Sequence, residues 1–112
     1  WRTGVSRFLG PDRLVCANGK NLEVYAVDGG WCLFTLKGHT RDVRCFSAVP
    51  PNRCVSFGDD FTLRIWLDDK CVRKIPITRR LATDCCLSFV SVDFLRGGGV
   101  VLCMGSSVYL VP

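Results

Sequence analysis

Hydrophobic and polar residues alternate along most of the chain in short runs, which is the pattern of half-buried β-strands. Three of these runs carry an aromatic residue directly after a β-branched one, and the aromatic residues are Tyr25, Trp66 and Tyr109. They follow one another at intervals of 41 and 43 residues. This spacing predicts a structural unit of about 40–45 residues that is repeated along the chain.

Each aromatic run completes a predicted hairpin. The strand before it covers residues 13–18, 53–57 or 100–104, and the turn between the two strands contains Gly19, Gly58 or Gly105. Further reversal signals precede these strands at residues 11–12, 50–52 and 97–99, and fourth strands are predicted at 31–36 and 71–77. No ten-residue stretch has the apolar spacing of a helix. The pattern therefore predicts an all-β chain of four-stranded antiparallel sheets.

Four polar or aromatic residues stand at defined intervals in the central unit. Residues 36–43 read LKGHTRDV and residues 56–66 read SFGDDFTLRIW. Ser56 lies four residues before Asp60, Asp60 lies six before Trp66, and 26 residues lie between His39 and Trp66. This arrangement resembles the WD-repeat family of β-propellers, in which a Gly-His pair, a Ser or Thr, an Asp and a Trp follow in this order. The resemblance implies a propeller fold.

The resemblance is strong over residues 36–75 and weaker outside them. Leu67 stands where the family has an Asp after the Trp, and Tyr25 replaces the Trp of the first unit. The third unit contains no His, and residues 78–82 stand where its Gly-His pair is expected. We therefore expect the outer units to be held by apolar packing alone.

The chemistry of the four side chains predicts a hydrogen-bonded relay. The indole of Trp66 can only donate, Ser56 can accept and donate onward, His39 can continue the chain, and Asp60 can accept at its end. A catalytic Ser, His and Asp arrangement uses the same residue types. We favour the structural interpretation, because Trp66 would bury the serine that an enzyme must expose.

The length of the chain limits what it can build. Its 112 residues, 48% hydrophobic and 22% charged, exclude intrinsic disorder and suffice for one domain or a piece of one. Because propellers close with about 4–8 blades, we expect an incomplete β-propeller whose ends are covered by the remainder of the propeller or a neighbouring subunit. Within the partial propeller of residues 1–112 we predict a blade remnant at 1–36, the best-defined repeat at 37–77, and a degenerate partial blade at 78–112.

The net charge of +5 favours acidic partners. In a four-stranded blade, the turn between strands two and three and the connection to the next blade emerge on one face of the disc. We therefore predict a partner-binding rim, with Phe61 as a stacking or anchor residue, that suits RNA phosphates or an acidic peptide. An ordinary solvated rim is the alternative, and the sequence alone favours it. The rim contains Lys20, Lys37, Arg41, Asp59, Phe61, Arg79 and Arg80, with Asn21, Thr40, Asp42 and Ser106 beside them.

The eight cysteines lie mostly within apolar stretches, which predicts reduced core residues in the cytosol or nucleus rather than the disulfides of a secreted protein. The neighbours Cys85 and Cys86 are likewise interpreted as core residues. With one His and no CxxC pair, we expect no metal site and no cofactor. The longest apolar run, at residues 100–104, is too short to span a membrane, so we expect no membrane partner.

These observations favour a non-enzymatic scaffold that binds other proteins within a larger multisubunit complex. The alternative is a propeller subunit of a ribonucleoprotein that contacts RNA through the basic rim. Residues 13–77 also resemble the opening blades of WD-repeat subunits of the small-subunit processome, the nucleolar particle that matures ribosomal RNA. The expected location is a reducing intracellular compartment, either the nucleus with its nucleolus or the cytoplasm.

Overall fold

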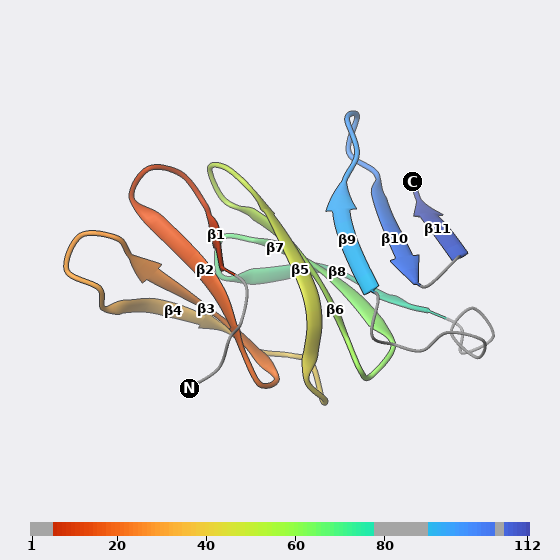
Figure 1. Ribbon diagram of the computed structural model, residues 1–112, viewed down its shortest axis with the longest axis horizontal. Helices are drawn as coiled ribbons and strands as arrows, with labels where there is room; N and C mark the ends of the chain where they lie inside the picture. The colour runs from red at the N-terminus through yellow and green to blue at the C-terminus, as the bar shows by residue number, and fades with distance from the viewer. Residues whose placement is uncertain (1–5, 78–89, 105–106) are drawn as a thin grey trace.

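A computed structural model describes residues 6–77, 90–104 and 107–112 of the chain (Figure 1). These residues form eleven β-strands and no helix. The described part of the chain therefore contains no membrane-spanning helix. The strands make three antiparallel sheets that lie side by side like the blades of a fan. The prediction of an all-β chain built from four-stranded antiparallel sheets is confirmed.

Each sheet is a meander in which neighbours in sequence are neighbours in space. The first sheet has the order β1-β2-β3-β4, with β1 at Ser6–Phe8, β2 at Arg13–Asn18, β3 at Asn21–Ala26 and β4 at Cys32–Leu36. The second has the order β5-β6-β7-β8, with β5 at Val43–Val49, β6 at Arg53–Gly58, β7 at Thr62–Leu67 and β8 at Lys70–Pro76. The third has the order β11-β10-β9, with β9 at Val90–Phe94, β10 at Val100–Met104 and β11 at Ser107–Val111.

The sheets pack face to face through two apolar clusters. Because successive residues of a strand point to opposite faces, β7 serves both clusters: Trp66 faces the first sheet and Ile65 faces the third. The first cluster joins Leu9, Val15, Leu22, Val24 and Leu36 to Phe46, Cys54 and Trp66. The second cluster joins Val55, Phe57, Leu63 and Ile77 to Val92, Val100, Leu102 and Val111. Burying one such side chain contributes about 1.5–3 kcal/mol, so these clusters hold the stack together.

The first two sheets repeat one another in detail. In each, the register between the third and fourth strands shifts at the aromatic residue, between Val24 and Tyr25 and between Ile65 and Trp66. In each, a cysteine of the fourth strand stands opposite that aromatic residue. The 41-residue sequence period thus corresponds to a period of backbone geometry.

The cysteines of the described residues are free thiols. Burial raises the pKa of Cys45 and of Cys54 to about 12. These two thiols therefore agree with the prediction that the cysteines lie in the core. The prediction is wrong for Cys32 and Cys71, which are exposed because β4 and β8 are the outer strands of their sheets. Cys85 and Cys86 lie outside the described residues.

Candidate functional site: a buried relay and a charged rim

The side chains of His39, Ser56, Asp60 and Trp66 form one continuous hydrogen-bonded relay. Trp66 Nε1 on β7 donates to Ser56 Oγ on β6 at 2.9 Å, and Ser56 Oγ lies 2.7 Å from His39 Nε2. His39 Nδ1 lies 3.1 Å and 3.2 Å from the two carboxylate oxygens of Asp60. The relay therefore ties the segment before β5 to both strands of the β6–β7 hairpin and to its turn.

Asp60 is the end point of the relay and also organises two loops. Its carboxylate accepts the backbone N–H of Thr40 at 2.9 Å and that of Thr62 at 3.2 Å. The Thr62 hydroxyl donates to the same carboxylate at 2.8 Å. These bonds fasten the β6–β7 turn to the connection that leads from the first sheet into the second. Sequence reasoning did not identify Thr40 or Thr62 as partners of Asp60.

The donors and acceptors of the relay fix its proton positions. Since the indole can only donate, Ser56 accepts from Trp66 and directs its own proton to Nε2 of His39. The imidazole is therefore neutral, with its proton on Nδ1, where it donates to Asp60. Protonated His39 would present a second donor to Ser56, and the serine proton would then have no acceptor within the relay.

The pKa shifts agree with a neutral imidazole beside a carboxylate. Burial lowers the pKa of His39 below 6.5, and the hydrogen bond and charge of Asp60 only partly oppose it. Burial raises the pKa of Asp60, but the hydrogen bonds from Thr40, Thr62 and His39 outweigh burial and lower it below 3.8. At neutral pH the pair consists of an uncharged histidine and an ionised aspartate.

Acid is expected to weaken the fold through this pair. Because the unfolded chain protonates His39 at a higher pH than the folded chain does, stability falls as the pH drops below 6.5 and falls further as Asp60 is protonated below 3.8. The loss of stability caused by His39→Gln should therefore be smaller at pH 5.5 than at pH 7.5, measured by urea unfolding of the full-length protein. An equal loss at both pH values would contradict the neutral, buried imidazole.

The relay cannot serve as a catalytic triad. Ser56 is fully buried, and its hydroxyl is engaged by both Trp66 and His39. A nucleophilic serine must reach a substrate carbonyl, and no substrate can reach this one while the fold is intact. The arrangement thus has a structural role, because it gives hydrogen-bond partners to the polar groups that are buried between the sheets.

Two glycines make room for this arrangement, in addition to the turn and the Gly-His pair in which the sequence places them. A methyl group at Gly58 would lie 2.7 Å from His39 Nδ1 and 2.9 Å from Asp60 Oδ1. A methyl group at Gly38 would lie 2.7 Å from a guanidinium nitrogen of Arg64. The glycine of the Gly-His pair and the glycine before Asp59 are therefore required by the close approach of these side chains.

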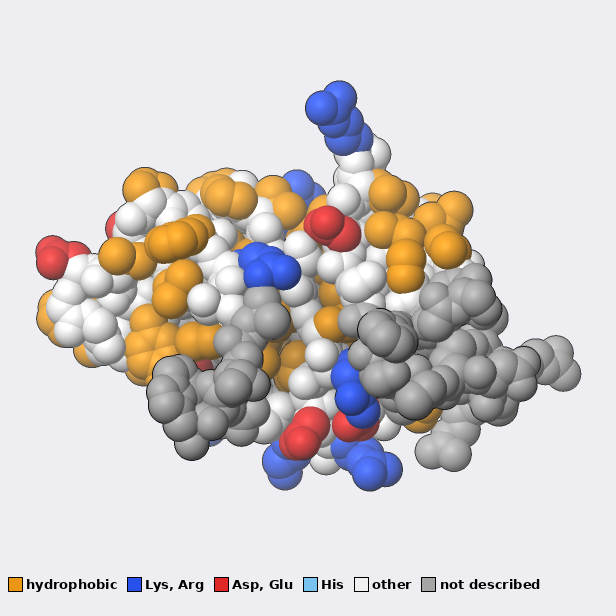
Figure 2. All heavy atoms as spheres, viewed as in Figure 1, with side chains coloured by type: hydrophobic (Ala, Val, Ile, Leu, Met, Phe, Trp, Pro, Cys, Tyr) orange, Lys and Arg blue, Asp and Glu red, His pale blue; other side chains and the backbone are white. Residues whose placement is uncertain are grey.

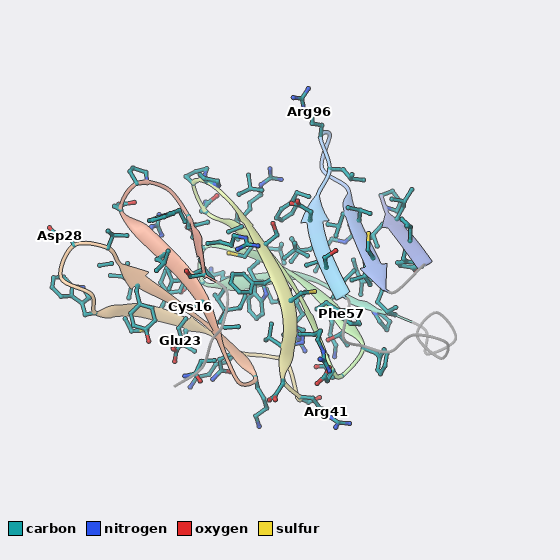
Figure 3. The ribbon with its side chains drawn as sticks, viewed as in Figure 1. Cys16, Glu23, Asp28, Arg41, Phe57 and Arg96 are labelled. Atoms are coloured by element: carbon teal, nitrogen blue, oxygen red, sulfur yellow. The ribbon has the colours of Figure 1, made fainter. Side chains whose placement is uncertain are left out.

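The predicted rim residues within the described part of the chain lie on neighbouring loops. Lys20 lies in the β2–β3 turn, Lys37 and Arg41 in the β4–β5 connection, and Asp59 in the β6–β7 turn. Backbone bonds join these loops: Val43 N–H donates to Gly19 C=O, and Asp59 N–H donates to Asp42 C=O, each at 2.8 Å. Figure 3 shows Arg41 at this edge of the stack and Arg96 at the opposite edge.

The rim carries charges of both signs (Figure 2). Asp59 is paired with Arg44, whose Nη2 lies 2.9 Å from the carboxylate. Lys20, Lys37 and Arg41 are exposed, and neither ion pair found among the described residues uses them. These three cations are the part of the rim that is available to an acidic partner.

Phe61, which the sequence suggested as a stacking or anchor residue, is half-buried. Its ring meets that of Phe57 edge-on, with the ring centroids 6.1 Å apart, and it packs against the second apolar cluster. Arg79, Arg80 and Ser106 lie outside the described residues. Within the described residues, no group of three potential ligands gathers as a metal site would require.

Comparison with known proteins identifies the fold. No protein-family model matches the sequence. The structure aligns with the WD40 β-propeller domain of Doa1 at a TM-score of 0.75, over 96% of this chain and 35% of that chain, with 19% sequence identity. Together with the blade-like sheets and the relay, this alignment shows that the chain has the fold of a WD40 β-propeller segment.

Curated relatives share part of the sequence. The nuclear distribution proteins PAC1 of Arthroderma otae and of Arthroderma benhamiae are each 44% identical to this chain over 48 residues. The match covers 42% of this chain and 10% of each relative. The chain thus spans about a tenth of the length of these relatives.

Proposed function

We propose that this propeller segment is a non-enzymatic scaffold that binds other proteins within a multisubunit complex. The burial of Ser56 and His39 carries the proposal, because it places the candidate nucleophile and base of the relay in the core of the fold. The exposed cations of the rim are then polar groups that a partner can bind. WD40 propellers typically bind other proteins, and the fold of this chain supports the same role.

The two ends of the stack support an assembly with further blades or a neighbouring subunit. Val108 and Leu110 on β11 are each 63% exposed, and Phe8 on β1 is 64% exposed. Burying exposed apolar strand faces of this kind against another protein surface is energetically favourable. We infer that additional propeller sequence or another subunit packs against them.

Exchanging the charge of the rim tests the scaffold. In the full-length protein, Lys20→Glu with Arg41→Glu should abolish the recovery of protein partners after nuclease treatment, because an acidic surface would be repelled. The charge-matched variant, Arg7→Glu with Arg96→Glu, should retain them, since Arg96 lies at the opposite edge (Figure 3). Partners retained equally by both variants would exclude the rim as their binding site.

The same exposed cations favour a second candidate, an RNA-contacting propeller of a ribonucleoprotein such as the ribosome-biogenesis particle. Under this alternative, nuclease releases the partners, and the rim variant binds single-stranded RNA with a shallower salt dependence. Unchanged RNA affinity in the rim variant would remove this candidate. The processome assignment rests on the order of strands and motifs in residues 13–77.

We further propose a reducing intracellular location, in the nucleus or the cytoplasm. Exposed thiols such as Cys32 and Cys71 persist unpaired in such compartments. Imaging of the tagged full-length protein tests this location, and a secreted protein would contradict it.

A further inference from the structure

The outer strand of the second sheet has a free edge and a strongly basic sequence. β8 is the last strand in the order β5-β6-β7-β8, so along one side its backbone has no neighbouring strand among the described residues. All of its residues except Ile75 are exposed, and three of them are Lys70, Arg73 and Lys74. The corresponding strand of the first sheet, β4, carries no charged residue. The charge is thus not a general feature of outer strands in this fold.

Two cations lie directly opposite one another beside this edge. Arg64 on β7 is the register partner of Lys74 on β8. Like charges in this relation destabilise a sheet, and neither residue takes part in an ion pair among the described residues. Both charges also contribute to the lowered pKa of His39. The positive charge at this position is therefore not neutralised within the described part of the chain.

The guanidinium of Arg64 is held at β8 rather than extended into solvent. Its Nη1 lies 3.8 Å from Cys71 Sγ, and Gly38 lies close to the same guanidinium. Its Nε is buried and has no hydrogen-bond partner. The fold thus fixes a cation beside the free edge without giving it an acidic partner.

Exposed apolar side chains lie beside the cations. Val72 is 53% exposed on β8, and Leu67 is 41% exposed at the end of β7. An edge that offers unpaired backbone groups, apolar side chains and positive charge matches an extended polypeptide, which can pair with a strand. A nucleic acid cannot form that ladder of main-chain hydrogen bonds.

We propose that the free edge of β8 binds an extended, acidic segment of a partner protein as an additional strand of the second sheet. The inference rests on the proposed function of binding proteins, and it identifies a partner class and a site distinct from the rim. Main-chain hydrogen bonds to β8 supply affinity, and alternate side chains of the segment supply specificity. Its carboxylates meet Arg64 and Lys74 on one face of the strand and Lys70 on the other.

A model peptide tests this site in the full-length protein. The probe is a capped octapeptide of alternating Glu and Val, followed by fluorescence anisotropy. We expect Lys70→Gln with Lys74→Gln to weaken its binding about five- to tenfold. The charge-matched rim variant, Lys20→Gln with Lys37→Gln, should bind it as the unaltered protein does. A peptide with alternate backbone nitrogens methylated, which cannot form the ladder, should bind at least about tenfold more weakly.

Four results would overturn the proposal. Equal losses in the β8 and rim variants, or binding that is indifferent to backbone methylation, would indicate diffuse attraction between charges. A single-stranded RNA oligonucleotide is the third probe. If the β8 substitutions weaken its binding as much as they weaken peptide binding, this edge binds nucleic acid. Failure of the peptide to bind, while nuclease-resistant complexes still depend on the rim, would reject this site and leave the scaffold function standing.

Discussion

Trp66→Ala should lower the free energy of unfolding of the full-length protein by about 3–5 kcal/mol. The side chain is only 2% exposed and lies in the cluster that joins the first two sheets. Its loss leaves a cavity between the sheets and removes the indole donor from Ser56. Urea unfolding measures the change.

Trp31→Ala is the matched control, because Trp31 is 61% exposed. Its substitution should change the free energy of unfolding by no more than about 0.5 kcal/mol. Trp66→Phe retains most of the apolar ring and removes the N–H, so its effect should lie between those of the two alanine variants. Equal effects at Trp66 and Trp31 would show that the first cluster does not hold the sheets together.

Ser56→Ala should have the second largest effect, although it removes a single oxygen atom. It leaves two buried groups without partners, the Trp66 Nε1–H and the His39 Nε2, at a cost of about 1–3 kcal/mol for each. The exposed Ser91 on β9 provides the control, since Ser91→Ala leaves no buried group unpaired. Thermal unfolding of the two variants compares them. A neutral Ser56→Ala would mean that the relay contributes nothing to stability.

The sequence predicts the strands and the relay spacing well, because both depend on local rules. Alternating side chains identify β6 and β7, and the turn at Gly58 fixes their pairing, so Ser56 and Trp66 must share a face of the sheet. The chemistry of one donor-only indole and one acceptor-only carboxylate then orders the four side chains. These inferences need no knowledge of how the sheets pack.

Features that depend on packing between sheets were not predictable in this way. Phe61 has a positive φ of 58°, and its place against Phe57 follows from the third sheet covering that face. Cys32 lies in a run that resembles a core strand, yet its strand, β4, is at the edge of the first sheet. Arg64 pairs with Lys74 across the two strands only because the register shifts between Ile65 and Trp66. No residue pattern in the sequence predicts that shift.

The protonation state of His39 tests the central claim, that four side chains form one buried relay, most directly. Nitrogen-15 NMR of the imidazole in the full-length protein at pH 7 should show a neutral ring with its proton on Nδ1, since Ser56 occupies Nε2 and Asp60 accepts from Nδ1. A ring protonated on Nε2, alone or together with Nδ1, would contradict the relay.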